Sequence, residues 1–189
     1  MHNQREYATI SREPTLTGPS SLGSAEAGIG AYRSAMRRLG GAVCVVTTTH
    51  KGQHFGLTAT AVCSLTAEPP RLLACINLAG TSYQLISESR VMGVNVLGPE
   101  HRELAMSFSR KAEDAELFDE KLWTTGATGA PLLTTAISNF DCEIEQMIVT
   151  STHAIVIGDV RYLAYNPEPP NDSDLLLHVD GRFHTNVGL

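Results

Sequence analysis

The chain has 189 residues, a hydrophobic fraction of 42% and a net charge of −6, values typical of one globular domain. Lys and Arg do not cluster beyond short pairs such as Arg37-Arg38, which argues against nucleic acid as a partner. No apolar run is long enough to cross a bilayer, and the first residues lack the pattern of a secretory signal. We therefore expect a cytoplasmic protein without a membrane partner.

The first 30 residues are rich in Ser, Gly, Pro and Thr and show little apolar periodicity. We interpret residues 1–30 as a flexible N-terminal arm that could dock on a partner subunit, and 31–189 as one domain. Residues 31–39 have apolar side chains at helical spacing, and Gly40-Gly41 ends the pattern.

The pattern then changes to runs rich in β-branched residues, which predict strands over 43–49, 56–66, 71–78, 91–97, 137–149, 153–165, 175–179 and 182–184. Only two short helices interrupt them, over 81–89 and 100–108. Because strands and helices do not alternate regularly, a parallel sheet is disfavoured. The pattern favours a mainly β fold, an antiparallel barrel with Greek-key connections and a few short peripheral helices.

The four cysteines, Cys44, Cys63, Cys75 and Cys142, stand alone in apolar or alternating stretches. Without a Cys-x-x-Cys pair, neither a zinc site nor a redox dithiol is predicted, and we expect no metal. We interpret the thiols as small buried apolar groups.

The stretch 56–66 reads as a strand, yet nearly all of its side chains are small, and hydroxyls recur at Thr58, Thr60, Ser64 and Thr66. Small residues would let a flat ligand lie against main-chain donors. The alternative is a barrel strand whose small side chains face a bulky neighbour. Composition alone leaves both interpretations open.

The same stretch, Gly-Leu-Thr-Ala-Thr-Ala-Val-Cys-Ser-Leu-Thr followed by Pro69-Pro70, resembles the signature segment of the short-chain flavin reductases. These are FMN-binding split-barrel proteins that serve as reductase components of two-component monooxygenases. Further matching motifs follow in order from Leu72-Leu-Ala-Cys-Ile-Asn77 to Leu175-Leu-Leu-x-x-x-Gly181-x-Phe183. The resemblance covers roughly residues 31 to 187.

The resemblance implies an NAD(P)H-dependent flavin reductase that passes a hydride from NADH or NADPH to FMN or FAD, which fits the lack of a nucleophile or metal motif. It also implies a homodimer and a separate oxygenase partner that uses the reduced flavin. The flavin-binding residues that it implies are Thr58, Thr60, Ala61, Val62, Cys63, Ser64, Asn77, Thr81, Ser82, Phe108, Ser109, Arg110 and Lys111. Thr81 and Ser82 would open a helix whose N-terminus accepts the phosphate.

Arg110 and Lys111 form a basic pair in a polar loop, which by itself is typical of a solvated surface. The resemblance makes them phosphate-binding candidates, and Arg110 is the better one because its planar fork can bind two oxygens.

His153 is the candidate active-site residue, because the resemblance places a histidine here on the nicotinamide side of the flavin. Relatives commonly have Gly-Asp before this histidine, whereas this chain has Ser151-Thr152, which leaves the tautomer and charge of His153 open. Two other departures are Thr60-Ala61, where relatives often carry Asn-Ser, and His178, where they often place a tyrosine near the barrel mouth.

Glu143 and Glu145 alternate on one strand and could resemble a catalytic acid pair, but we interpret them as solvated carboxylates. Two other functions remain open on the sequence. One is a non-catalytic flavin- or haem-binding barrel, favoured by the Ser151-Thr152 departure. The other is a flavoenzyme that holds FMN tightly and reduces a different acceptor.

Overall fold

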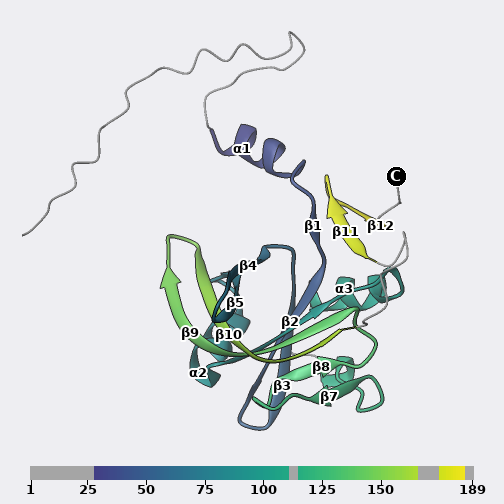
Figure 1. Ribbon diagram of the computed structural model, residues 1–189. Coiled ribbons are helices and arrows are strands. Elements are labelled where there is room, and N and C mark those ends of the chain that lie inside the picture. The colour runs from purple at the N-terminus through teal and green to yellow at the C-terminus, as the bar shows by residue number, and fades with distance from the viewer. Residues whose placement is uncertain (1–27, 111–114, 166–174, 186–189) are drawn as a thin grey trace, which may run out of the picture.

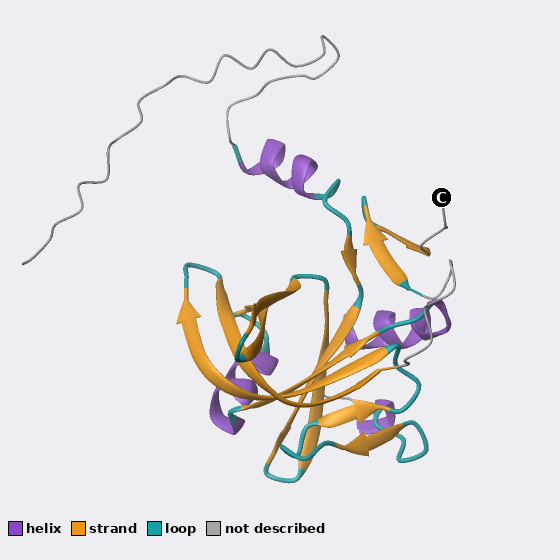
Figure 2. Cartoon of the chain, viewed as in Figure 1, coloured by secondary structure: helices purple, strands orange, loops and turns teal. Residues whose placement is uncertain are grey.

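The computed structural model describes residues 28–110, 115–165 and 175–185, and Figures 1 and 2 show a strongly curled sheet with short helices around it. The helical elements are α1 (Ile29–Met36), α2 (Thr81–Ser89), η1 (Pro99–His101), α3 (Arg102–Phe108) and η2 (Ala115–Leu117). The strands are β1 (Gly41–Ala42), β2 (Cys44–His50), β3 (Gln53–Ala59), β4 (Val62–Ala67), β5 (Pro70–Asn77), β6 (Val91–Val96), β7 (Trp123–Thr125), β8 (Pro131–Leu133), β9 (Ser138–Val149), β10 (His153–Tyr165), β11 (Leu176–Val179) and β12 (Arg182–Thr185).

The main sheet has the strand order β3-β2-β6-β9-β10-β5-β4, and each neighbouring pair is antiparallel. Its two edge strands, β3 and β4, are consecutive in the chain and joined only by Thr60 and Ala61. The sheet must therefore curl until its edges approach each other, which makes it a barrel. The prediction of a mainly β, antiparallel barrel with a few short helices is confirmed.

Strand β2 lies at the centre of the packing because both of its faces are buried. Cys44 and Val46 belong to an apolar cluster inside the barrel, where Ile86 of α2 also packs. Val43, just before the strand, and Val45 belong to a second cluster on the outer face. Successive side chains of a strand point to opposite faces, so a continuous apolar run is what a strand between two cores requires.

The second cluster is built on aromatic rings contributed by segments that follow the barrel strands. Phe108 of α3 contacts Trp123 of β7 edge to face, with ring centroids 5.8 Å apart, and Phe118 lies between the same elements. The small β7–β8 sheet that carries Trp123 was not predicted. Strands of three residues are too short to show a period-two pattern.

Helix α1 differs from the prediction in its bounds and in its packing. It spans Ile29–Met36 rather than 31–39, and none of its residues is buried. Figure 1 shows it standing away from the barrel, next to β1 and the β11–β12 hairpin. The predicted arm lies outside the described residues except for its last three positions. No helix in the described part of the chain is long and apolar enough to span a membrane.

The cysteines are only partly as predicted. Cys44 and Cys142 are buried, and burial raises the pKa of each thiol to about 12, so both stay protonated at neutral pH. Cys75 is half-buried and Cys63 is exposed, which corrects the interpretation of all four as buried groups. Cys63 is exposed because β4 is an edge strand with little packed over it.

Candidate functional site

Three neighbouring strands bring several of the predicted site residues to one end of the sheet. Strand β5 pairs with β10 so that Asn77 lies opposite His153, and the Cys75 N–H donates to the Ala61 carbonyl at 2.9 Å. The start of β4, the end of β5 and the start of β10 are therefore side by side. Because neighbouring strands are about 4.8 Å apart, Ala61 and His153 flank a zone about 10 Å wide.

Strand β4 is an open edge of the sheet, and its small residues are accessible. Thr60, Ala61, Cys63 and Ser64 are exposed and Val62 is half-buried. Main-chain groups of an antiparallel strand alternate in direction, so the bond at Ala61 turns those of Val62 and Ser64 away from β5. The strand thus presents main-chain donors and slim side chains along its free side.

A cavity of about 420 Å³ opens beside β4 at the mouth of the barrel. Val62, Cys63 and Ser64 line one side of it, and apolar side chains of the barrel interior, including Val94 and Phe140, line the other. Its volume is within the range of pockets that hold small organic ligands. The combination of apolar wall and main-chain donors suits a flat aromatic ligand with polar edges.

Helix α2 begins immediately after β5 and adds a second type of donor to this end of the sheet. Its N-cap is Gly80, which makes no side-chain capping bond, so the first N–H groups of the helix are available to an anion. Thr81 is exposed and Ser82 is buried. Asn77 accepts a hydrogen bond from the Ala79 N–H at 2.9 Å through its Oδ1, so this oxygen shapes the turn that leads into the helix.

The turn before β10 holds His153 at the surface through three contacts. Thr150 bonds the His153 carbonyl twice, through its N–H at 2.8 Å and its hydroxyl at 2.6 Å. The Thr152 hydroxyl lies 2.8 Å from His153 Nδ1. A hydroxyl can donate or accept, so Thr152 serves either tautomer where an aspartate would favour an N–H at Nδ1. From the sequence, Ser151-Thr152 meant only the loss of the Gly-Asp pair found in relatives, and the contact of Thr152 with His153 was not predicted.

Three predicted site residues on and around α3 use their side chains for packing. Thr58 donates its hydroxyl to the Ala105 carbonyl at 2.6 Å, and Ser109 donates to the Met106 carbonyl at 2.7 Å. The Phe108 ring is 2% exposed within the second cluster, so any contact of Phe108 with a ligand must come from its main chain. Arg110 is exposed in the turn that follows α3, and Lys111 lies outside the described residues.

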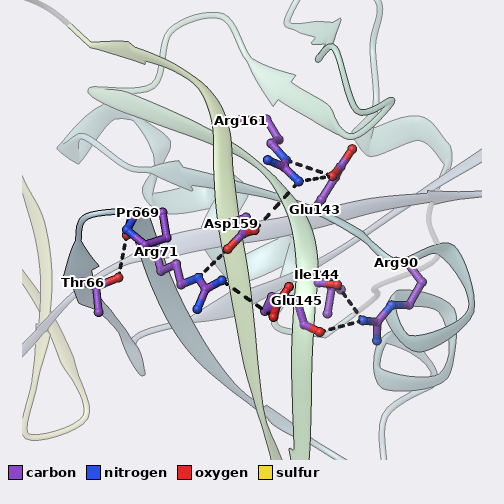
Figure 3. Close-up of polar contacts among 9 residues, drawn as sticks. All are labelled: Thr66, Pro69, Arg71, Arg90, Glu143, Ile144, Glu145, Asp159 and Arg161. Carbon is purple, nitrogen blue, oxygen red and sulfur yellow. Dashed lines mark hydrogen bonds and ion pairs between the residues drawn. The ribbon is translucent and has the colours of Figure 1, made fainter.

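The carboxylates of Glu143 and Glu145 take part in a chain of ion pairs across β5, β10 and β9 (Figure 3). Arg161 binds Glu143 at 2.7 Å, and Arg71 binds Asp159 at 2.6 Å and approaches Glu145 at 3.7 Å. Both glutamate side chains are about half exposed, at 55% and 51%. They are surface carboxylates paired to arginines, which accounts for them without an acid–base role.

Comparison with known proteins identifies the family. The model of the flavin reductase like domain matches residues 36–186. The chain belongs to the flavin reductase family. The resemblance seen in its motifs is thereby confirmed, and with it the class of the protein as an oxidoreductase.

Individual flavin reductases match most of the chain. The FMN reductase (NADH) RutF of Pantoea ananatis is 39% identical over 153 residues, which cover 81% of this chain and 78% of the relative. The structure of a flavin reductase domain protein from Arthrobacter sp. FB24 aligns with a TM-score of 0.74 and 26% identity over 85% of this chain and 96% of its own. BorF, the flavin reductase component of a bacterial two-component tryptophan halogenase, has the same fold, with a TM-score of 0.76, 24% identity, and 85% of this chain and 99% of its own covered.

The residues at the β4 edge fit a flavin on three observations. Outward main-chain groups at Val62 and Ser64 match the polar edge of an isoalloxazine ring, and the apolar cavity beside them matches its body. The uncapped N-terminus of α2 matches the phosphate. Each feature comes from a different element. The cavity extends along β4 to Arg71 and Leu72 at the start of β5, whereas α2 follows Asn77 at the opposite end of that strand.

Proposed function

We propose that this protein is an NADH-dependent flavin reductase whose flavin site is the open edge of β4. The observation that carries the proposal is the exposure of Thr60–Ser64 next to the paired residues Asn77 and His153. FMN or FAD, when bound, supplies the ring that accepts a hydride from the nicotinamide. The protein then has to bind and orient the flavin and the nicotinamide, and to keep water from the contact between the two rings.

The main chain of β4 holds the flavin ring in this proposal. N–H groups of Val62 and Ser64 point from a strand that is anchored to β5 on its other side, so they are fixed before the ligand arrives. Fixed dipoles stabilise negative charge at the ring edge without the cost of reorienting. The replacement of Asn-Ser by Thr60-Ala61 leaves this main-chain part unchanged, since it does not depend on side chains.

The phosphate is bound by the N-terminus of α2 at Thr81 and Ser82. Arg110, exposed in the turn after α3, stays a prediction as a second phosphate ligand. His153 borders the nicotinamide. Its ring is held through Nδ1 by Thr152, which leaves Nε2 to meet the ligand as either donor or acceptor. The role of His153 is to position the dinucleotide; hydride transfer itself requires no acid or base from it.

We further propose that the protein works as a homodimer in the cytoplasm and delivers reduced flavin to a separate oxygenase. Exposed apolar residues support the dimer: Ile148 and Val149 at the end of β9, at 42% and 57%, and Tyr162 and Leu163 on β10, at 62% and 55%. The free, exposed thiol of Cys63 suits a compartment that keeps thiols reduced.

The test is to mix the purified protein with NADH and FMN and to follow the absorbance of NADH. We expect oxidation well above the uncatalysed rate, and no increase above that rate would reject the reductase function. Gel filtration of the protein loaded with FMN separates two modes of action. A protein that emerges colourless uses flavin as a substrate, whereas a yellow one retains it as a bound cofactor.

A further inference from the structure

A second cavity, of about 400 Å³, is lined in part by Thr60 and lies between helix α1 and the turn that joins β11 to β12. Tyr32, Arg33 and Arg37 of the α1 region line one wall, and Thr60 and His178 line the other. The sequence assigned no function to the arginines of this helix. The cavity adjoins the proposed flavin edge because Thr60 precedes Ala61 at the start of that edge.

The position of α1 over this cavity is set by main-chain contacts. The Asp180 N–H donates to the Arg37 carbonyl at 2.7 Å, and Gly41 of β1 pairs with His178 of β11. Gly41 also lies so close to Thr60 that a Cβ on it would be 2.8 Å from the Thr60 carbonyl oxygen. The segment that leads out of α1 is therefore packed against both the hairpin and Thr60, and these contacts hold the wall of the cavity in place.

The side chains in this cavity have the chemistry of a nucleotide site. Arg33 and Arg37 are four residues apart and so project from the same face of the helix. Among the residues that the structure describes, no carboxylate forms an ion pair with either guanidinium. Guanidinium groups bind phosphate oxygens in pairs, and the rings of Tyr32 and His178 can stack on a purine.

The acidic residue at the same cavity limits where a phosphate can lie. Asp180 lines it next to His178. A carboxylate repels phosphate but accepts hydrogen bonds from ribose hydroxyls. The pyrophosphate is thus expected on the side of the helix and the ribose on the side of the hairpin.

We propose that this cavity binds the ADP moiety of a dinucleotide, with Arg33 and Arg37 on the pyrophosphate. The inference rests on the proposed function, because the shared residue Thr60 links the cavity to the flavin edge. Two ligands of the reaction carry an ADP moiety, NADH and FAD, and the chemistry of the site is the same for both. FMN and reduced nicotinamide mononucleotide lack that moiety and make it possible to tell the two sources apart.

The test uses the full chain with the double substitution Arg33→Gln/Arg37→Gln. Its matched control is Arg38→Gln, which removes a neighbouring exposed charge that does not line the cavity. The first readout is binding of ADP by isothermal titration calorimetry, without flavin or turnover. We expect the double variant to bind about tenfold more weakly than wild type and the control to bind as wild type does, since charged hydrogen bonds are lost only in the former. Equal ADP binding by wild type and the double variant overturns the proposal.

The second readout identifies the source. If the cavity holds the ADP of NADH, the KM for NADH rises in the double variant and the KM for reduced nicotinamide mononucleotide does not. If it holds the ADP of FAD, the KM for FAD rises and that for FMN does not. An equal rise for FMN or for the mononucleotide overturns the proposal, because the damage would then lie at the flavin edge. Failure of the reductase function would show separately, because the wild-type protein would then not oxidise NADH above background with either FMN or FAD.

Discussion

The two halves of the stretch 56–66 have similar composition but different surroundings. In β3, Gly56 lies against the Phe108 ring, and a Cβ on it would be 2.7 Å from a ring carbon. Thr58 bonds the Ala105 carbonyl, and Ala59 is buried. In β4, from Val62 onward, the side chains are half-buried or exposed. The side chains of the first half are small because α3 packs against them. Those of the second half are small at an open edge of the sheet.

The difference shows that one run of small residues can have two origins, close packing and an open edge, which composition cannot separate. The interpretation as space for a bulky neighbour is confirmed for the first half, whereas a ligand on the exposed second half stays a prediction. The boundary lies at Thr60-Ala61, where the chain passes from one edge strand of the sheet, β3, to the other, β4. The flavin proposal applies only to the second half. Four experiments test whether the two halves differ in this way.

The largest effect is expected from Gly56→Ala, which tests the packed half. The added methyl group would overlap the Phe108 ring, which is held by Phe118 and Trp123. Overpacking of this kind lowers the free energy of unfolding by about 1–3 kcal/mol. Urea unfolding measures it, with Gly30→Ala in open space on α1 as the control that should lose no stability. A fully stable Gly56→Ala protein would show that the ring can give way.

Ala61→Trp tests the open half. A large ring on the exposed edge should obstruct the flavin and raise the KM for FMN about tenfold, which corresponds to about 1.4 kcal/mol. Stability should change by less than about 0.5 kcal/mol, because the position is exposed. Gln53→Trp, an exposed position on the other edge strand, is the matched control. The same KM for FMN in all three proteins would remove β4 from the flavin site.

His153→Ala should have a smaller effect and should be confined to the dinucleotide. Loss of one hydrogen-bonding ring is worth about 1 kcal/mol, so we expect the KM for NADH to rise about fivefold. Flavin affinity, measured by fluorescence titration, should stay unchanged. Thr152→Val removes the contact at Nδ1 and should give part of the same rise in the KM for NADH. Loss of flavin binding in His153→Ala would instead place the histidine against the flavin.

The smallest effect concerns pH and His101, which ends η1 directly before α3. Its ring accepts a hydrogen bond from the Gly98 N–H at 3.2 Å and lies 2.8 Å from the Thr135 hydroxyl. Burial lowers the pKa of His101 against an opposing effect of Glu100. The neutral ring therefore stabilises the fold above the ordinary histidine pKa of about 6.5, and this contribution is lost as pH falls toward the lower folded value.

The check is urea unfolding of wild type and His101→Gln at neutral and mildly acidic pH. The wild type should lose more stability on acidification than the variant, which has no ring to protonate. Equal losses in the two proteins would mean that His101 does not contribute to the acid sensitivity.

The fold was predictable to the extent that it depends on local patterns. Residues 81–89 form a helix and 153–165 a strand with the predicted bounds, because the periodicity and the turns that set these bounds lie within or next to each segment. The β7–β8 hairpin was missed since its strands are too short, and the stretch 56–66 was read as one strand although it spans two sheet edges.

The candidate site was predictable only in part, because its residues come together through contacts that local patterns do not specify. The strand register that pairs Asn77 with His153 depends on segments far apart in the chain. The same is true of the bond that commits Thr58 to α3 and of the burial of Phe108. The proposed role of Arg33 and Arg37 depends on a hairpin at the other end of the sequence.

The family, the antiparallel class and the positions of the longer strands and helices could be read from the sequence, because turn residues, periodicity and motifs are properties of neighbouring residues. Tertiary structure alone decided which of the small, hydroxyl-bearing residues face solvent and which fill space beneath a ring. Exposure is set by what packs over a residue, and for both β3 and β4 those neighbours, or their absence, come from elsewhere in the chain.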